Sequence, residues 1–179
     1  MHKDVERIVY SQQQLSEVCD RLALEINNDY KGRKVVVIGI LKGCVLFFSD
    51  LFRRLEIDCT MDFMAASSYG SGTKSSGNVK ITKDITEEIS GKDVILVEDI
   101  LDTGNTLSYI KEYLESSSPA SVRICTLFDK PSRRTENIIA DYKGFTIDDV
   151  FIVGYGLDYA EKYRNLPYVG VLKPEVYDK

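Results

Sequence analysis

The stretch VILVEDILDTGNT, residues 94–106, carries the strongest fold signal in the chain. Its first four residues form an apolar run that is typical of a buried parallel strand. Two adjacent acids, Glu98 and Asp99, end this run, and a loop of small polar residues follows from Asp102 to Thr106. Apolar residues at positions 107, 110 and 114 then recur at helical spacing. A strand, a small polar loop and a helix in this order aim backbone N–H groups at an anion such as a phosphate.

The carboxylates of Glu98, Asp99 and Asp102 beside this predicted anion site need an explanation, because they would repel an anion. They are compatible with it if they bind sugar hydroxyls, hold a divalent cation or move a proton. A sugar phosphate with Mg²⁺ would use all three roles. The alternative is a buried strand followed by an ordinary acidic turn that caps the helix at Asp102 or Thr103.

Composition excludes several other classes of protein. The 179 residues suffice for one domain with a substantial core, and the net charge of −5 argues against a protein that binds nucleic acid mainly by electrostatics. The longest apolar run, around Val35–Leu41, is too short to span a bilayer, and residues 1–4 do not begin a secretory signal. We therefore expect a cytoplasmic protein with no membrane or nucleic-acid partner. The single histidine, His2, falls in a predicted frayed terminus, which leaves acid–base chemistry to carboxylates, lysines or tyrosines.

Helix and strand patterns alternate along the chain. A capping box at Ser11 and Gln14 opens a helical stripe that ends near Gly32, and apolar spacing between positions 45 and 55 marks a second helix. Strands are predicted at 35–40, 57–66, 93–97, 122–128, 150–153 and 168–172. The alternation predicts an α/β fold, with a mainly parallel central sheet flanked by helices, in a single domain spanning residues 1–179. The Gly/Ser-rich stretch 67–78 is predicted to be a loop inside that domain.

Polar side chains follow the predicted strands where open parallel sheets bind their ligands, at the C-terminal strand ends. Lys42 and Gly43 follow the strand at 35–40, and Lys130 follows the strand at 122–128. Asp158 comes shortly after the strand at 150–153. We expect these residues to gather with the phosphate loop at one edge of the sheet, a grouping that solubility alone does not explain.

The residues from Leu41 to the C-terminus resemble purine phosphoribosyltransferases of the hypoxanthine-guanine type, the bacterial enzymes above all. Residues 94–106 resemble the phosphoribosyl pyrophosphate signature of that family. Three further segments resemble its pyrophosphate loop, the start of its mobile loop and its base-stacking and metal segment; they are residues 41–43, 68–70 and 151–159.

Single residues extend the resemblance. Lys130 matches the family's purine-binding lysine, and Arg164 matches an arginine that contacts pyrophosphate. Asn105 stands where some relatives carry lysine, but its amide can still donate a hydrogen bond to a phosphate.

The resemblance implies the type I phosphoribosyltransferase fold, in which a small hood covers the central sheet. It implies purine salvage, in which the 5-phosphoribosyl group of phosphoribosyl pyrophosphate moves to N9 of hypoxanthine, and of guanine, to give IMP or GMP and pyrophosphate. It also implies Mg²⁺ as cofactor, assembly as a homodimer or homotetramer, and a Leu41–Lys42 peptide that can be cis.

The resemblance assigns the phosphate-binding and metal-binding roles. Lys42, the Gly43 amide and Arg164 would hold pyrophosphate, because arginine offers a fork of two hydrogen bonds. The 5′-phosphate would bind in the loop formed by Asp102, Thr103, Gly104, Asn105 and Thr106. Glu98, Asp99 and Asp158 are the candidate metal ligands.

Glu98 and Asp99 would also accept hydrogen bonds from the ribose hydroxyls. Adjacent residues of a regular strand point to opposite faces, so both acids reach the sugar only if the strand breaks there.

The purine-binding roles also follow from the resemblance. Asp102 would be the general base for the N7 proton. The Lys130 ammonium only donates hydrogen bonds, which suits a 6-oxopurine and mismatches a 6-amino group; the alternative is a solvated lysine. Phe151 would stack on the base, or else belong to the core, and Ile152 would offer backbone groups.

The loop at 67–78 and the substrate choice leave alternatives open. Ser68 and Tyr69 would close over pyrophosphate as part of a mobile lid that excludes water, or the segment is only a flexible surface loop. A transferase that prefers xanthine or guanine shares the same signature. RNA-binding regulators also occur on this fold, but the net charge of −5 disfavours one here.

Overall fold

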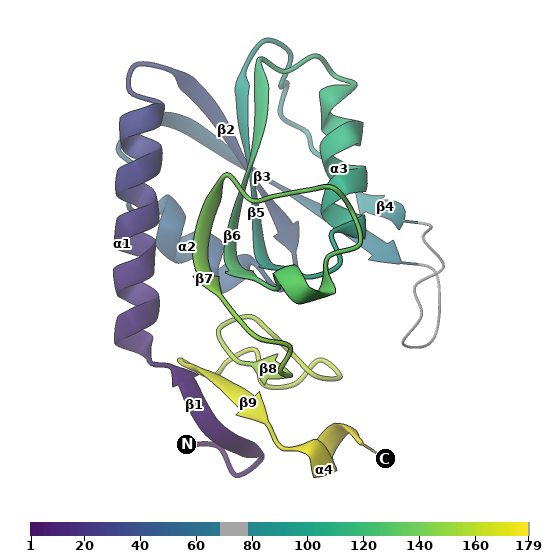
Figure 1. Ribbon diagram of the computed structural model, residues 1–179. Helices are drawn as coiled ribbons and strands as arrows, with labels where there is room; N and C mark the ends of the chain where they lie inside the picture. Colours follow the sequence, from purple (N-terminus) through teal and green to yellow (C-terminus); the bar gives the residue numbers. More distant parts are fainter. Residues whose placement is uncertain (69–78, 179) are drawn as a thin grey trace.

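The computed structural model describes residues 1–68 and 79–178. Within them are two β-sheets, and the smaller one lies beyond the strand ends of the larger one (Figure 1). The larger one, the core sheet, has the strand order β4-β3-β2-β5-β6-β7. Its strands are β2 (Lys34–Leu41), β3 (Asp58–Ser68), β4 (Val79–Lys83), β5 (Asp93–Leu101), β6 (Ser121–Asp129) and β7 (Tyr142–Thr146). All neighbouring pairs are parallel except β3 and β4, so the predicted mainly parallel sheet is confirmed.

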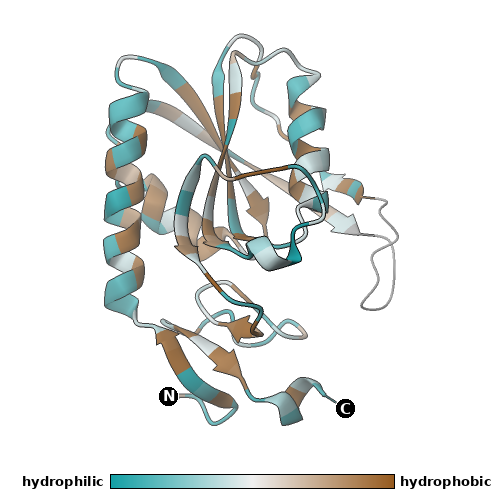
Figure 2. Cartoon of the chain, viewed as in Figure 1, coloured by the Kyte–Doolittle hydropathy of each residue, from teal (hydrophilic) through white to brown (hydrophobic). Residues whose placement is uncertain are grey.

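Helices cover both faces of the core sheet. Helices α1 (Gln12–Asp29) and α2 (Val45–Phe52) pack in one apolar cluster with Val35 and Val37 of β2. Helix α3 (Asn105–Glu115) packs on the other face, against the alternate residues Val36, Ile38 and Ile40. Because β2 is buried on both faces, its sequence is a continuous apolar run and does not alternate (Figure 2). None of the helices in the described ranges is long and apolar enough to cross a membrane.

Helix α1 begins where the sequence predicts. The Ser11 hydroxyl accepts from the Gln14 amide, and the Gln14 side chain accepts from the Ser11 amide, so the capping box is formed. The buried stripe consists of the residues that the spacing predicts, namely Leu15, Val18, Cys19, Leu22, Ala23 and Ile26. The second predicted helix, whose apolar spacing runs from position 45 to 55, is confirmed as α2, but it ends at Phe52, and Val45, where the spacing begins, is exposed while Phe47 is buried.

The smaller sheet, the hood sheet, joins both ends of the described chain. Strand β1 (Val5–Tyr10) pairs antiparallel with β9 (Val169–Leu172), which pairs antiparallel with β8 (Ile152–Val153). The short helix α4 (Pro174–Tyr177) follows β9, and the single 3₁₀ turn η1 (Pro131–Arg133) follows β6 in the core sheet. Figure 1 shows the hood sheet below the C-terminal edge of the core sheet, where the ligand site is expected.

The N-terminal residues are tied to the hood, so the expectation of a frayed terminus at His2 is wrong. The His2 backbone N–H donates to the Tyr168 hydroxyl over 2.7 Å, and its ring lies edge-on to Tyr163 at 5.3 Å between centroids. Strands β1, β4 and β7 were not predicted. Of the predicted loop at 67–78, Ser67 and Ser68 belong to β3, and residues 69–78, Tyr69 among them, lie outside the described residues.

Candidate active site

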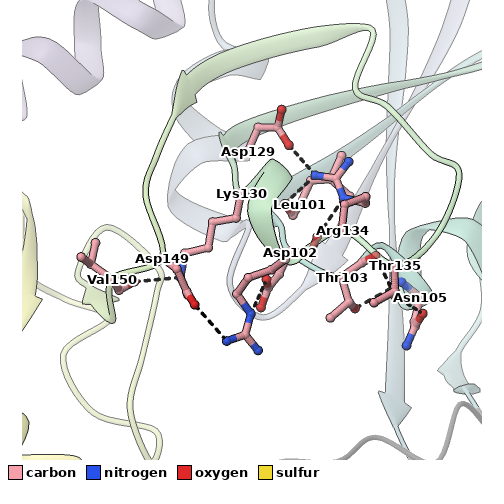
Figure 3. Close-up of polar contacts among 11 residues, drawn as sticks. Leu101, Asp102, Thr103, Asn105, Asp129, Lys130, Arg134, Thr135, Asp149 and Val150 are labelled. Carbon is pink, nitrogen blue, oxygen red and sulfur yellow. Dashed lines mark hydrogen bonds and ion pairs between the residues drawn. The ribbon is translucent and has the colours of Figure 1, made fainter.

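The loops after β2, β5 and β6 meet at the C-terminal edge of the core sheet, facing the hood. Figure 3 shows Asp102, Thr103 and Lys130 close together there, with Asp149 and Val150 coming from the segment that leads into the hood. The sequence prediction that strand-end residues gather at one edge is therefore confirmed for this group.

The loop after β5 turns sharply into α3. Gly104 precedes the helix with φ of +92°, and a Cβ there would come within 2.6 Å of the Ile138 side chain. Only glycine fits that conformation and that space without strain. The backbone N–H of Asn105 donates to the Thr103 hydroxyl over 3.4 Å. A small cavity of about 90 Å³ opens beside the loop, with Glu98, Thr103 and Thr106 in its lining. It presents a helix N-terminus and small polar groups, as a phosphate requires.

Arg134 holds the backbone of the loop after β5 through hydrogen bonds, a role that the sequence analysis missed. Its guanidinium donates to the backbone carbonyls of Leu101, Asp102 and Ile138 over 3.0, 2.8 and 2.7 Å, and it pairs with Asp129 (Figure 3). These carbonyls are thereby satisfied by the protein itself. Arg134 is four residues beyond Lys130, and its contacts depend on the folded path of the loop rather than on any local pattern.

Asp102 lies at the centre of the group. Its Oδ1 atom is 3.0 Å from Arg133 Nε, yet the two are not aligned for a hydrogen bond, and Oδ1 is buried with no hydrogen-bond partner among the described residues. Arg133 also approaches Asp149, with 3.5 Å between Nη1 and Oδ2. Sequence reasoning missed Arg133, which offers a second cation beside the candidate base. Oδ1 of Asp102 therefore accepts no hydrogen bond from the described residues, and its neighbour is the charge of Arg133.

Lys130 is buried, unlike most lysines that follow a strand. Its ammonium donates to the Val150 carbonyl over 2.7 Å and lies 3.6 Å from Asp149 Oδ1. These two acceptors aim the ammonium along the start of the segment that contains Phe151. The alternative of a solvated lysine is wrong, since only 7% of Lys130 is exposed.

Phe151 is 39% exposed, so it is not the core residue of the alternative interpretation. Its ring stacks on Tyr177 at 4.9 Å between centroids and meets Tyr159 edge-on at 5.7 Å. The next residue, Ile152, is buried in β8. An aromatic ring beside a fixed ammonium is a suitable surface for a flat, polar heterocycle.

The acids Glu98 and Asp99 do not break the strand. Strand β5 continues to Leu101 in unshifted register with β6, so the two side chains leave opposite faces of the sheet. Asp99 packs against the loop after β2: a Cβ on Gly43 would lie 1.8 Å from Asp99 Oδ2. Glu98 faces the cavity of the phosphate loop. The break that would bring both acids to one sugar is absent from this strand.

Ionising Glu98 or Asp99 costs free energy, because both carboxyl groups are buried. Burial raises the pKa of Glu98 well above its ordinary range, and the neighbouring Asp99 charge raises it further. Burial raises the pKa of Asp99 to about 6, against the opposing effect of backbone hydrogen bonds and the Arg164 charge. A cation nearby would favour the ionised forms of both.

A cluster of charges connects the loop after β2 with the hood. The peptide bond Leu41–Lys42 is cis, and the Lys42 ammonium pairs with Glu161 at 3.0 Å. Arg164 pairs with Asp158 at 2.8 Å and donates to the Gly156 carbonyl over 2.7 Å. The two cations predicted to hold pyrophosphate therefore lie at one place, although they come from distant parts of the chain.

The carboxylates of Glu98, Asp99 and Asp158 suit Mg²⁺ only when a ligand supplies further oxygen atoms to the ion. Within residues 1–68 and 79–178, no group of three or more metal-ligating side chains is arranged to hold an ion. Mg²⁺ commonly takes one or two carboxylates and completes its shell with substrate phosphate and water. Glu98, Asp99 and Asp158 suit that mode: Glu98 Oε2 is buried without a hydrogen-bond partner among the described atoms, and a cation would counter the raised pKa values.

Comparison with known proteins agrees with this geometry. Residues 7–160 match the family model of the phosphoribosyl transferase domain. The hypoxanthine-guanine phosphoribosyltransferase of Staphylococcus epidermidis is 50% identical over 179 residues, which cover 100% of both chains. A crystal structure of a hypoxanthine phosphoribosyltransferase from Staphylococcus aureus superposes with a TM-score of 0.97 at 48% identity, covering 100% of this chain and 97% of that one.

A longer relative contains the same unit. The bifunctional protein TilS/HprT of Listeria monocytogenes is 48% identical over 179 residues, and this chain spans 28% of its length. Full-length similarity, the matching fold and the strand-end residues agree with one another. The chain belongs to the phosphoribosyltransferase family, and within it to the hypoxanthine-guanine type found in bacteria.

Proposed function

We propose that this protein is a purine-salvage enzyme that transfers the 5-phosphoribosyl group of phosphoribosyl pyrophosphate to N9 of hypoxanthine or guanine. The products are IMP or GMP and pyrophosphate. One observation carries the proposal: the Asp102 carboxylate and the buried, oriented Lys130 ammonium lie beside the phosphate loop, linked through Arg133 and Asp149. The names of the relatives from S. epidermidis and S. aureus support this activity.

The phosphate groups would bind at two places. The loop of Asp102, Thr103, Gly104, Asn105 and Thr106 would take the 5′-phosphate, with the N-terminus of α3 behind it. Lys42, the Gly43 N–H and Arg164 would take the pyrophosphate. Ser68 and Tyr69 would also contact the pyrophosphate.

Asp99 and Asp158 would hold Mg²⁺ on the pyrophosphate side, directly or through water, and Glu98, on the other face of β5, would meet a cation only on the side of the 5′-phosphate. When bound, the ion would offset negative charge on the departing pyrophosphate. Because Glu98 and Asp99 lie on opposite faces of β5, Asp99 would serve the pyrophosphate side of the ribose and Glu98 the side of the 5′-phosphate.

The purine would lie between Phe151 and the Lys130 ammonium, and the Ile152 backbone would contact its 2-position. Lys130 would donate to the 6-oxo group, and its fixed position would disfavour the 6-amino group of adenine. Asp102 would accept the N7 proton as N9 bonds to the ribose carbon, which avoids positive charge on the base.

The test is nucleotide formation from phosphoribosyl pyrophosphate and Mg²⁺ with hypoxanthine, guanine, xanthine and adenine in parallel. We expect turnover of hypoxanthine and guanine and none of adenine. Preferential turnover of xanthine would correct the substrate assignment. No turnover of any purine, in folded protein that still binds phosphoribosyl pyrophosphate, would overturn the proposal and favour a regulator.

We also propose that the protein is a cytoplasmic homodimer or homotetramer. Analytical ultracentrifugation of the purified chain distinguishes these two assemblies from a monomer.

A further inference from the structure

Glu161 lies between the two cations that the proposed function gives to pyrophosphate. Its Oε2 atom is 3.0 Å from Lys42 Nζ and 3.5 Å from Arg164 Nη2. Lys42 comes from the loop after β2, whereas Glu161 and Arg164 come from the hood. A single carboxylate oxygen therefore bridges both sides of the site.

The backbone presents Glu161 at this position. A tight turn brings Tyr159 and Lys162 together through two backbone hydrogen bonds of 3.2 and 3.0 Å, and Glu161 adopts φ of +64° within it. Its N–H donates to Asp158 Oδ2 over 2.8 Å. The turn is thus anchored at the residue proposed to bind the metal, and the Glu161 side chain extends from it toward the cations.

The ion pair between Lys42 and Glu161 is weak enough for an anionic ligand to replace it. The side chains of Lys42 and Glu161 are 67% and 65% exposed, so water screens their attraction and the pair is weak. A carboxylate oxygen and a phosphate oxygen accept the same hydrogen bonds from lysine and arginine. They cannot occupy one place between the two cations, and their like charges repel.

We propose that Glu161 is an internal substitute for pyrophosphate, which occupies the anion position between Lys42 and Arg164 and must move away before phosphoribosyl pyrophosphate binds. The inference rests on the proposed function, because that function assigns Lys42 and Arg164 to pyrophosphate. The fraction of protein in which Glu161 covers the cations lowers the apparent affinity for the anion. After the reaction, its return to Lys42 and Arg164 favours release of pyrophosphate.

A purely positioning role gives the opposite result. If Glu161 served to hold Lys42 and Arg164 in place for the ligand, removing its charge would weaken pyrophosphate binding. The negative groups that face the same cations, Asp158 on the hood and Asp99 on β5, remain in either case. The sign of the change in affinity therefore separates the two roles.

The experiment compares the wild type with Glu161→Gln, which keeps the shape and removes the charge. Inorganic pyrophosphate with Mg²⁺ is titrated by calorimetry, and KM for phosphoribosyl pyrophosphate and product inhibition by pyrophosphate are measured. We expect about two- to fivefold tighter pyrophosphate binding in the variant, the size of an exposed ion pair, with a lower KM and stronger product inhibition. The difference should shrink at high salt, because salt screens an exposed pair.

Glu25→Gln is the matched control. Glu25 is also exposed and pairs with an arginine, Arg21, at 2.7 Å, but it lies on α1 away from the site. We expect wild-type binding and kinetics from it. An active wild type with unchanged or weaker pyrophosphate binding in Glu161→Gln would overturn the inference alone. A wild type that forms no nucleotide would overturn the proposed function and the inference with it.

Discussion

The Gly43 carbonyl oxygen occupies the place that a side chain on Gly156 would need. A Cβ on Gly156 would come within 2.0 Å of that oxygen, and one on Gly43 would come within 1.8 Å of Asp99 Oδ2. Gly156, Gly43 and Asp99 are therefore stacked in direct contact, from the hood to the core sheet. This packing fixes how closely the hood approaches the loop after β2.

Gly156→Ala should raise KM for phosphoribosyl pyrophosphate, because the added methyl pushes the hood away from Gly43. Overpacking of this kind costs about 1–3 kcal/mol, which corresponds to about 5- to 150-fold in affinity. Steady-state kinetics and thermal unfolding measure the effect. Gly91→Ala is the control: Gly91 also has positive φ, +69°, but nothing lies within 4 Å of its added Cβ. Equal effects on KM from the two variants would count against the packing argument.

Asp102→Asn should lower kcat by about 10²–10⁴-fold, because the amide cannot accept the N7 proton. The Asp102 backbone carbonyl keeps its hydrogen bond from Arg134, so the loop should keep its conformation. IMP binding, measured by calorimetry, should therefore survive. Equal loss of IMP affinity and of rate would instead assign Asp102 a structural role.

Lys130→Ala should weaken hypoxanthine binding by about 10- to 100-fold, the usual value of a hydrogen bond from a charged group. KM for phosphoribosyl pyrophosphate should stay close to the wild-type value, because Lys130 contacts Val150 and Asp149 and not the phosphate loop. Separate KM measurements for the two substrates check this. Unchanged affinity for hypoxanthine would rule out Lys130 as the purine-reading group.

Asp62 gives the fold a stability that depends on acid pH. It accepts backbone hydrogen bonds from Phe63, Thr86 and Glu87 over 2.7, 2.6 and 3.0 Å, which join β3 to the segment between β4 and β5. Burial opposes its ionisation, but these hydrogen bonds prevail and lower the pKa of Asp62 from 3.8 to about 2.

The sign of the pH effect follows from that shift. Above pH 4 the carboxylate is ionised in both states and its full contribution, about 2 kcal/mol, is present. As the pH falls from about 4 to about 2, the unfolded chain takes up the proton first, and the contribution is lost. Urea unfolding should show the gap between wild type and Asp62→Asn narrowing across this range. A gap that does not change with pH would contradict the assignment.

The sequence was informative wherever a signal was local. The Ser11–Gln14 capping box and the apolar stripe of α1 need only neighbouring residues, and the strand-end rule placed Asp102 and Lys130 at the same edge. Strands β1, β4 and β7 were missed because each is short and only partly buried, as in the β4 sequence VKITK. Such strands are defined by their partners rather than by their own pattern.

The candidate site was predicted only in part, because some of its contacts also depend on residues far apart in the sequence. Arg133, Arg134 and Glu161 were missed because their contacts are made by loops whose path depends on the whole fold. The predicted strand at 93–97 ended too early, because β5 continues through Glu98 and Asp99 to Leu101 in register with β6, so the condition for both acids to reach one sugar is not met.

The pairing of β1 with β9 sets an order of assembly during synthesis. Val5 pairs with Leu172, so β1, the first of the described strands to be synthesised, can join the hood sheet only after β9, the last of them, has been made. Strands β2, β5 and β6 can associate earlier, with Lys42, Asp102 and Lys130 already at their ends. A nascent chain therefore places these three residues at the edge of the core sheet before Phe151, Arg164 and the rest of the hood are made, and the proposed site is complete only when β9 is in place.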